Sequence, residues 1–268
     1  RNRVHLYEAG SDGSDPRHRE ILRAADIQKS VENDRFALHY QPIFEIRHGE
    51  PSRPWRYELL VRMLDTDDEL VHPVDFIPAA ERYGLMHRID RWVVETSFRN
   101  FSRLFPGEPE ARISINLSGN SINDPEFLKF LETQFKKSKV AAGRVCFEIT
   151  ETAAIRNLDA ARELMSRIKA IGGEFALDDF GSGLSSFAYL KSLPVDYLKI
   201  DGSFVRNIET DLSDRAMVEA VHSVAETLKL RTVAEYVESE RCVDVLREIG
   251  IDYGQGFALG RPRALPAE

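Results

Sequence analysis

The sequence predicts an α/β protein whose parallel strands close into a barrel. Segments with strand and helix patterns alternate about seven times after residue 50, as expected for parallel strands joined by crossover helices. Eight candidate strands without a composition break favour one closed sheet. An open doubly wound sheet is the alternative, and it is disfavoured because no glycine-rich dinucleotide fingerprint follows the first strand.

The N-terminal part is expected to hold a linker, one helix and two strands. Residues 1–19 are charged and rich in Gly, Ser and Asp, which indicates a linker or the tail of an upstream domain, and the barrel is expected over residues 20–268. A helix is expected over 21–32, and a strand over 36–46 with a break at Gln41-Pro42. No helix separates this strand from the next, at 55–64, so we expect it to pair irregularly.

The remaining elements follow from the spacing of apolar residues. Alternation predicts strands, and a spacing of three to four residues predicts amphipathic helices. The further strands are expected at 112–117, 145–150, 174–177, 196–200, 231–235 and 251–253. The helices are expected at 73–83, 88–104, 124–137, 159–171, 214–228 and 239–249.

Composition restricts the partners and the compartment. With 268 residues and 43% hydrophobic content the chain can bury a large core. The net charge of −8 argues against a nucleic-acid polymer as partner, although a small anion remains compatible with a locally positive site. Cys146 and Cys242 have no zinc or disulfide spacing, and no signal peptide or membrane-length apolar run occurs. We therefore expect a cytoplasmic domain, with room for a membrane anchor elsewhere in a longer parent protein.

Two adjacent carboxylates, Asp178 and Asp179, follow an apolar run and precede a Phe-Gly-Ser-Gly turn. Two unit charges roughly 4 Å apart repel by about 4 kcal/mol at an effective dielectric of about 20. Such a pair needs solvent, a proton or a cation. At a strand end that faces a cavity a divalent cation is favoured, and a solvated surface turn is the alternative.

Polar residues also lie at or just after the ends of nearly all the remaining expected strands. A single Glu at a strand end is more often structural, but barrel enzymes collect their chemistry at the C-terminal ends of the strands. The residues at these ends are Glu58, Asn116, Glu148, Asp178, Asp179, Lys199, Asp201, Glu235 and Gln255. The sequence therefore predicts one site at this end of the barrel.

Five of these carboxylates could not all stay ionised in one pocket without counter-charge, namely Glu58, Glu148, Asp178, Asp179 and Glu235. Two divalent ions would supply it, and all-oxygen ligands without His or Cys select Mg²⁺ or Mn²⁺ over Zn²⁺. Such a pair suits in-line displacement at phosphorus, whereas Ca²⁺ should bind without supporting it. Cations would lower the pKa of Lys199 and carboxylates would raise it, so both a general base and a water-orienting ammonium remain open.

These residues resemble the motifs of the EAL-domain family of cyclic di-GMP phosphodiesterases. The resemblance covers about residues 26–265 in order. The matching segments are Gln41-Pro42-Ile43, Glu58-Leu59-Leu60-Val61-Arg62, Asn116-Leu117-Ser118, Phe147-Glu148-Ile149-Thr150-Glu151, Asp178-Asp179-Phe180-Gly181-Ser182-Gly183, Lys199-Ile200-Asp201, Ala234-Glu235 and Gln255-Gly256-Phe257.

The resemblance implies a modified TIM (β/α)8 barrel with an antiparallel first strand. It implies hydrolysis of cyclic di-GMP to linear pGpG in bacterial second-messenger signalling, two Mg²⁺ or Mn²⁺ ions, inhibition by Ca²⁺ and a homodimer. By analogy the first metal ion would be held by Glu58, Asn116, Glu148 and Asp178. The second would be held by Asp178 and Asp179, with Glu235 acting directly or through water.

The resemblance also assigns roles around the metals. Lys199 would assist the attacking water, with Glu58 and Glu235 as further catalytic groups, and Glu151 would anchor the loop after Asp178-Asp179. The substrate-binding residues implied are Gln41, Leu60, Arg62, Asp201, Glu238, Gln255 and Phe257. A structural ion pair is the alternative for Arg62, and a plain turn is the alternative for Gln255-Gly256.

Three residues depart from the family pattern, and none removes a metal ligand. Leu59 replaces Ala, Ser182 replaces a common Thr, and Tyr236 stands where Gly is frequent after Glu235, a departure that leaves the detail of the guanine pocket open. The first seven residues resemble the tail of a diguanylate cyclase (GGDEF) domain, which implies upstream regulatory domains. A catalytically silent cyclic di-GMP receptor is the alternative function, but such domains typically lose an acidic ligand or the lysine.

Overall fold

The computed structural model describes residues 25–49, 53–65, 67–105, 107–108, 110–181 and 187–265. The expected linker at residues 1–19 lies outside these ranges, as do Ser182 and Gly183 of the turn after Asp178-Asp179. Residues 25–32 are helical, which agrees with the described part of the helix expected there. No helix among the described residues combines the length and apolar character needed to cross a bilayer.

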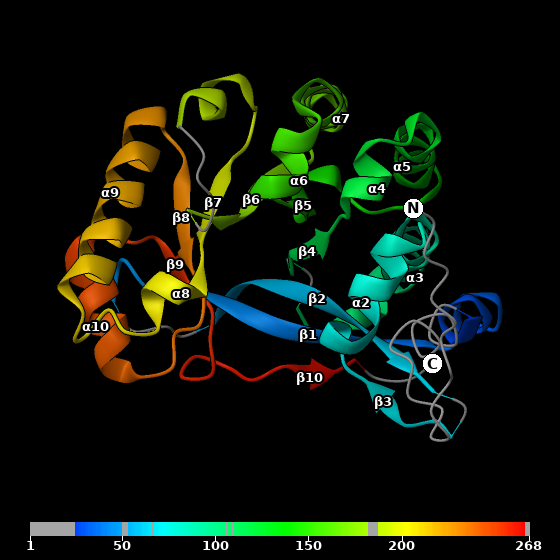
Figure 1. The fold of residues 1–268 in the computed structure, drawn as a ribbon, viewed down its shortest axis with the longest axis horizontal. Helices are drawn as coiled ribbons and strands as arrows, with labels where there is room; N and C mark the ends of the chain where they lie inside the picture. Colours follow the sequence, from blue (N-terminus) through cyan, green and yellow to red (C-terminus); the bar gives the residue numbers. More distant parts are fainter. Residues whose placement is uncertain are drawn as a thin grey trace, which may run out of the picture.

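A closed ring of eight strands forms the centre of the molecule (Figure 1). The ring strands are β1 (Phe36–Glu45), β2 (Pro54–Leu64), β4 (Ile113–Asn116), β5 (Val145–Thr150), β6 (Glu174–Phe180), β7 (Tyr197–Ile200), β8 (Arg231–Ala234) and β9 (Tyr253–Gly254). The adjacent pairs β2–β4, β4–β5, β5–β6, β6–β7, β7–β8 and β8–β9 are all parallel. Strand β1 is antiparallel to both β2 and β9 and closes the ring. The expected modified TIM barrel with an antiparallel first strand is confirmed.

The break expected at Gln41-Pro42 is wrong, because β1 runs through both residues and is irregular only between Ile43 and Phe44. Pro42 lies opposite Tyr57, whose N–H points away from β1 and donates to Arg112 O at 2.9 Å. The nitrogen of Pro42 therefore faces the other side, where β10 (Arg263–Ala264) has ended and β9 has not begun. Proline is tolerated there because no ladder hydrogen bond is lost.

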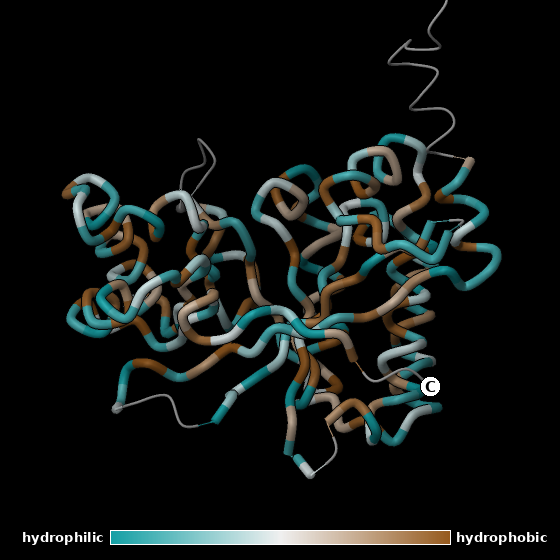
Figure 2. Tube along the Cα trace, turned by 90° about the horizontal axis from the view of Figure 1, so that it is seen from below, coloured by the Kyte–Doolittle hydropathy of each residue, from teal (hydrophilic) through white to brown (hydrophobic). Residues whose placement is uncertain are grey.

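Helices cover the outside of the barrel (Figure 1). The long ones are α2 (Pro73–Arg82), α3 (Met86–Leu104), α5 (Pro125–Lys137), α7 (Leu158–Ala170), α9 (Leu212–Leu228) and α10 (Glu240–Ile249), each within two residues of its expected bounds. Hydrophobic and hydrophilic residues alternate along these helices (Figure 2), as expected when one face is buried. The short elements β3 (Leu70–Val71), β10, α4 (Gly119–Ile122), α6 (Glu151–Arg156) and α8 (Gly202–Val205), and the 3₁₀ turns at Ala142–Arg144 and Phe187–Ser192, were not expected.

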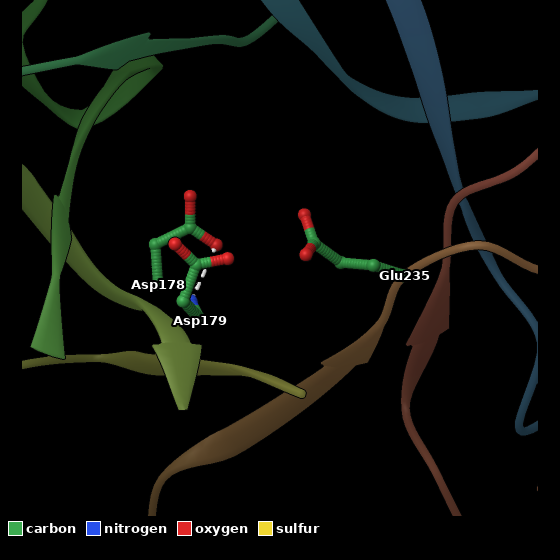
Figure 3. Close-up of side chains that lie close together, drawn as sticks. All are labelled: Asp178, Asp179 and Glu235. Atoms are coloured by element: carbon green, nitrogen blue, oxygen red, sulfur yellow. Dashed lines mark hydrogen bonds between the residues drawn. The ribbon is translucent and has the colours of Figure 1, made fainter. Parts of the chain in front are cut away.

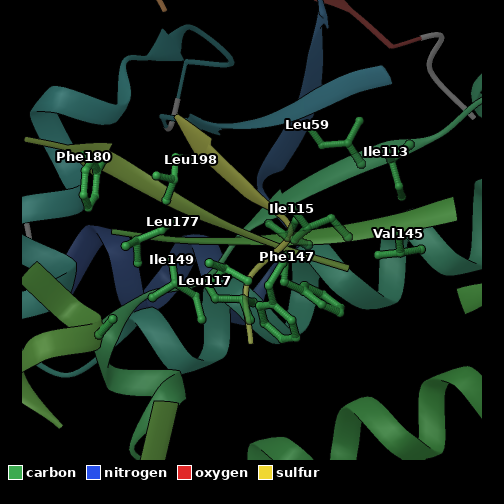
Figure 4. Close-up of a cluster of buried hydrophobic side chains, with 14 of the residues drawn as sticks. Leu59, Ile113, Ile115, Leu117, Val145, Phe147, Ile149, Leu177, Phe180 and Leu198 are labelled. Carbon is green, nitrogen blue, oxygen red and sulfur yellow. The ribbon is translucent and has the colours of Figure 1, made fainter. Parts of the chain in front are cut away.

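The core has two parts that follow the alternation of the strands. Outward-facing residues such as Ile115, Phe147 and Leu177 pack beneath the helices (Figure 4). A smaller cluster fills the barrel interior toward the N-terminal ends of the strands and contains Ile43, Cys146, Ala176, Tyr197, Val233 and Tyr253, with Trp55 packed against it. Arg56 is buried against the rings of Trp55 and Tyr197 in this lower layer and pairs with Glu174. Glu58, Glu148 and Lys199 lie two residues further along their strands on the same inward face, and therefore toward the opposite end.

Candidate active site

A cavity of about 370 Å³ opens at the C-terminal ends of the strands. It is lined by Gln41, Glu58, Leu60, Asp178, Asp179, Glu235, Tyr236, Glu238, Gln255, Gly256 and Phe257. The structure therefore brings residues from β1, β2, β6 and the segments after β8 and β9 to one place, as the sequence predicts.

Lys199 lies at the centre of the acidic cluster and is only 1% exposed. Its Nζ atom lies 2.5 Å from Glu148 Oε2, 2.8 Å from Glu235 Oε1, 3.2 Å from Asp178 Oδ1 and 3.5 Å from Glu58 Oε2. Among the described residues, no other basic side chain forms a salt bridge with these four carboxylates. One ammonium group thus links acidic residues from β2, β5 and β6 with the residue that follows β8.

The electrostatics of the cluster are set by burial and by this lysine. Burial alone would lower the pKa of Lys199, but the four carboxylates outweigh it and hold that pKa well above its usual value. Burial raises the pKa of Glu148 to about 7, despite the attraction of Lys199. Burial likewise raises the pKa of Asp178 and holds that of Glu235 well above its usual value. The site without metal therefore contains more negative charge than its single cation stabilises.

Glu58 differs from the other acids because amides hold its carboxylate. Asn116 Nδ2 donates to Glu58 Oε1 at 2.6 Å, and Gln255 Nε2 donates to Glu58 Oε2 at 2.6 Å. Burial would raise the pKa of Glu58, but Lys199 and these two amides outweigh burial and lower it. Gln255 Nε2 also lies 3.3 Å from Gln41 Oε1, which ties β1 to the same network. The side chain of Gln255 thus contributes more than a plain turn would.

Both aspartates of the adjacent pair reach the cavity because the end of β6 is irregular. The pairing of β6 with β7 shifts between Leu177 and Phe180, and Asp179 has a φ of 53°. In a regular strand consecutive side chains point to opposite faces, whereas here one oxygen each of Asp178, Asp179 and Glu235 lies within 4.8 Å of the other two. Figure 3 shows the aspartates and Glu235 pointing toward one another from β6 and β8.

The donor set fits a pair of hard divalent cations. Glu58, Glu148, Asp178, Asp179 and Glu235 against one ammonium leave a net charge of −4 when all are ionised. Burial, followed by the charges of neighbouring acids, raises the pKa of Asp179 to about 6, although Lys199 acts in the opposite direction. The buried Oε1 atom of Gln255 has no hydrogen-bond donor among the described residues, so an acceptor is free for a water molecule beside the acids.

The remaining substrate-binding candidates lie around this centre. Leu60, Glu238 and Phe257 line the cavity. Arg62 lies on the wall of a neighbouring cavity of about 700 Å³ that also contains Asn116 and Leu60. Its guanidinium donates to Val61 O at 2.8 Å and makes no salt bridge within the described ranges, so the structural ion pair is not seen.

Asp201 has a local structural contact in addition to its expected role. Its carboxylate caps α8 by accepting from Ser203 N at 2.7 Å. Its negative charge also helps to raise the pKa of Asp179, which places it beside the acidic cluster.

Glu151 lies where a loop anchor is expected. This buried carboxylate accepts from Gly181 N at 3.1 Å and from the Tyr189 hydroxyl at 2.6 Å, so it binds residues on both sides of 182–186. Sequence reasoning missed Tyr189, because its partner is 38 positions away and no motif marks it. It also missed Asp90, a buried residue of α3 that accepts from Ser118 N at 2.9 Å and Ser118 Oγ at 2.6 Å next to β4.

Comparisons with known proteins identify a family and several relatives of this chain. The EAL domain family model matches residues 24–262. The chain is 38% identical over 264 residues to the cyclic di-GMP phosphodiesterase PdeB of Shewanella oneidensis, covering 98% of this chain and 31% of the relative. It is 36% identical over 239 residues to PdeF of Escherichia coli, covering 89% of this chain and 31% of the relative. The chain thus spans about a third of the length of these curated relatives.

Solved structures share the fold closely. The PaMucR phosphodiesterase in its c-di-GMP complex has a TM-score of 0.83 at 32% identity, with 92% of this chain and 98% of that one covered. The FimX EAL domain from Pseudomonas aeruginosa bound to c-di-GMP has a TM-score of 0.81 at 29% identity, with 90% and 96% covered. From the family match over nearly its whole length, together with the barrel and its acidic site, this chain belongs to the EAL domain family.

Proposed function

We propose that this chain is a metal-dependent phosphodiesterase that hydrolyses cyclic di-GMP to linear pGpG. The observation that carries the proposal is the convergence of Glu58, Glu148, Asp178 and Glu235 around Lys199, with Asp179 beside them, at one cavity. Relatives named as cyclic di-GMP phosphodiesterases and family structures with c-di-GMP bound support the choice of substrate.

The metal-holding residues follow from the oxygen donors at the site. One ion would be held by Glu58, Asn116, Glu148 and Asp178, and a second by Asp178 and Asp179, with Glu235 beside it. When bound, two Mg²⁺ or Mn²⁺ ions supply an activated water and screen the charge of the phosphate. Carboxylate and amide oxygens without thiolate or imidazole suit these two metals.

Lys199 is proposed to act as a hydrogen-bond donor that orients the attacking water. Its ammonium is held by four carboxylates, which keep its pKa well above the usual value in the site without metal and favour the protonated donor. Gln255 is proposed to keep Glu58 in place through its amide nitrogen, while its Oε1 accepts a hydrogen bond from the water. Arg62, on the neighbouring cavity wall, is proposed to contact a phosphate oxygen.

A silent receptor is the second candidate, since an EAL fold can bind the dinucleotide without cleaving it. Every acidic ligand and the lysine expected for turnover are present and close together here, which favours the enzyme. The test is hydrolysis of cyclic di-GMP by the purified chain with Mg²⁺, Mn²⁺, Ca²⁺ or chelator, with the products separated by chromatography.

We expect pGpG with Mg²⁺ or Mn²⁺, and no turnover with Ca²⁺ or chelator. Glu58→Ala and Asp178→Ala should abolish turnover, because each removes charge that holds a metal. Glu132→Ala, which breaks an ion pair with Arg167 on the outer helices, is the matched control and should leave turnover unchanged. Binding of cyclic di-GMP without hydrolysis under every metal condition would favour the receptor instead.

The wider context is also proposed from the family resemblance. We expect a homodimer, upstream regulatory domains in the parent protein and a cytoplasmic location for this domain. Sedimentation of the purified chain tests the dimer, and a fluorescent fusion of the full-length parent protein tests the location.

A further inference from the structure

Tyr236 combines a strained backbone with an exposed aromatic ring at the active-site cavity. It follows Glu235 directly and has a φ of 53°, a left-handed conformation that glycine adopts freely and bulky side chains rarely do. Its side chain is 48% exposed and lines the cavity. A large ring held in this conformation at a ligand site suggests a contact with the ligand.

The ring is supported from one short helix. Cζ of Arg206 lies 4.1 Å from the ring centroid, a distance typical of a cation–π contact. Gly202, four residues earlier, lies so close that an added Cβ would be 2.0 Å from a ring carbon. The ring is thus fixed against α8, and its exposed part faces the cavity.

The backbone beneath Tyr236 is joined to the segment after β9. Val237 N donates to Gln255 O and Ala258 N donates to Val237 O, each at 3.0 Å. A Cβ on Gly256 would meet the Val237 backbone at 2.2 Å, so the two segments are in direct contact. We call this unit, residues 235–237 with 255–258, the aromatic ledge.

The ledge carries two of the three exposed aromatic side chains among the described residues, Tyr236 and Phe257, while the third, Tyr83, lies elsewhere. Phe257 is also paired with a cation, since Arg261 Cζ lies 4.4 Å from its centroid. Exposed rings on a rigid support beside cationic groups are typical of surfaces that stack nucleobases.

We propose that Tyr236 is a substrate-binding residue whose ring stacks on a guanine base of cyclic di-GMP, with Arg206 positioning the ring. The inference rests on the proposed function, because it takes its ligand from it. It adds a base contact on the β8 side, where family members that carry glycine have no side chain.

The test compares the affinity for cyclic di-GMP of the intact chain and of Tyr236→Gly and Tyr236→Phe. Calorimetry with Ca²⁺ present, and chromatography to confirm that the ligand stays intact, gives Kd. Initial rates with Mg²⁺ or Mn²⁺ give KM and kcat. Glycine relieves the backbone strain at this position, so a loss of affinity in Tyr236→Gly would not reflect unfolding.

Lys229→Gly is the matched control. Lys229 also has a positive φ, 61°, but it lies before the start of β8, whereas Tyr236 lies after the end of that strand. The same change in backbone freedom there should leave Kd and KM unchanged.

We expect Tyr236→Gly to raise Kd and KM about tenfold, the usual effect of losing one base-stacking ring, and Tyr236→Phe to keep both within about twofold of the parent chain. Arg206→Ala should raise Kd by a smaller factor. Parent-like Kd and KM in Tyr236→Gly would overturn the inference while leaving the proposed function intact. An equal loss in Tyr236→Phe would also overturn it, because the hydroxyl rather than the ring face would then be the contact. Failure of the parent chain itself to bind or cleave cyclic di-GMP would refute both proposals.

Discussion

Replacing Lys199 by Met should destabilise the protein strongly when metal is absent. The ammonium lies 2.5–3.5 Å from oxygens of three buried carboxylates and of Glu235, which is partly buried. Each contact corresponds to an attraction of about 5–7 kcal/mol at an effective dielectric of about 20. Desolvation and repulsion among the acids offset most of this, and removing one partner of a buried ion pair typically costs about 3–5 kcal/mol. We expect a loss of this size for Lys199→Met.

The loss should depend on pH and on metal. Burial raises the pKa of Glu148 to about 7, so lowering the pH neutralises acids of the cluster and should reduce the penalty of Lys199→Met. Mn²⁺ should also restore part of the stability, because it replaces the missing counter-charge.

The assay is urea unfolding in chelator at pH 8 and at pH 6, repeated with Mn²⁺. Lys169→Met is the matched control, because Lys169 pairs with Asp196 at a partly exposed site and should lose no more than about 1 kcal/mol. Lys199→Met as stable as the parent chain in chelator at pH 8 would refute the idea that this lysine balances the acids.

Three other changes test separate features. Burial raises the pKa of Asp90 to about 6, so the folded state binds a proton more tightly than the unfolded state, and the stability carried by the neutral acid is lost as pH rises through that value. Relative to Asp90→Asn, the parent chain should gain about 1 kcal/mol between pH 7 and pH 5, and parallel curves of unfolding free energy against pH would contradict this. Glu151→Ala should weaken Mn²⁺ binding about 10- to 100-fold, measured by calorimetry, and unchanged affinity would show that the anchor does not act on the metal site. Gly256→Ala should lose at least about 2 kcal/mol of stability in urea, because its Cβ would meet Val237 at 2.2 Å. Gly143→Ala, with its nearest contact at 3.6 Å, is the control, and equal losses would contradict the close approach.

The alternation of the strands was sufficient to predict the barrel and the end at which the site lies. Glu58 and Leu60, two residues apart on β2, both line the cavity, as period-two alternation requires. The very short strands β3 and β10 could not be predicted, because two residues carry no periodic signal.

The details of the acidic site depend on backbone irregularities that no residue pattern reveals. Alternation alone would have separated Asp178 from Asp179, and the positive φ of Asp179 brings them together. The sequence could not decide whether the pKa of Lys199 is raised or lowered, because this depends on how many carboxylates lie within a few ångströms of the ammonium. The structure places four there. The position of Tyr236 against α8 depends likewise on the tertiary contact with Gly202.

Because β1 is antiparallel to its neighbours, the preceding part of the chain joins the barrel at a different end than it would with a parallel first strand. Phe36 at its start pairs with Met63 near the end of β2, so the backbone arriving from helix 25–32 joins the ring at the edge that holds the acidic cluster. With a parallel first strand the same backbone would arrive beneath the layer formed by Trp55 and Tyr253. A force transmitted through that helix would therefore reach the end of the barrel that holds the acidic cluster before it reaches the hydrophobic interior.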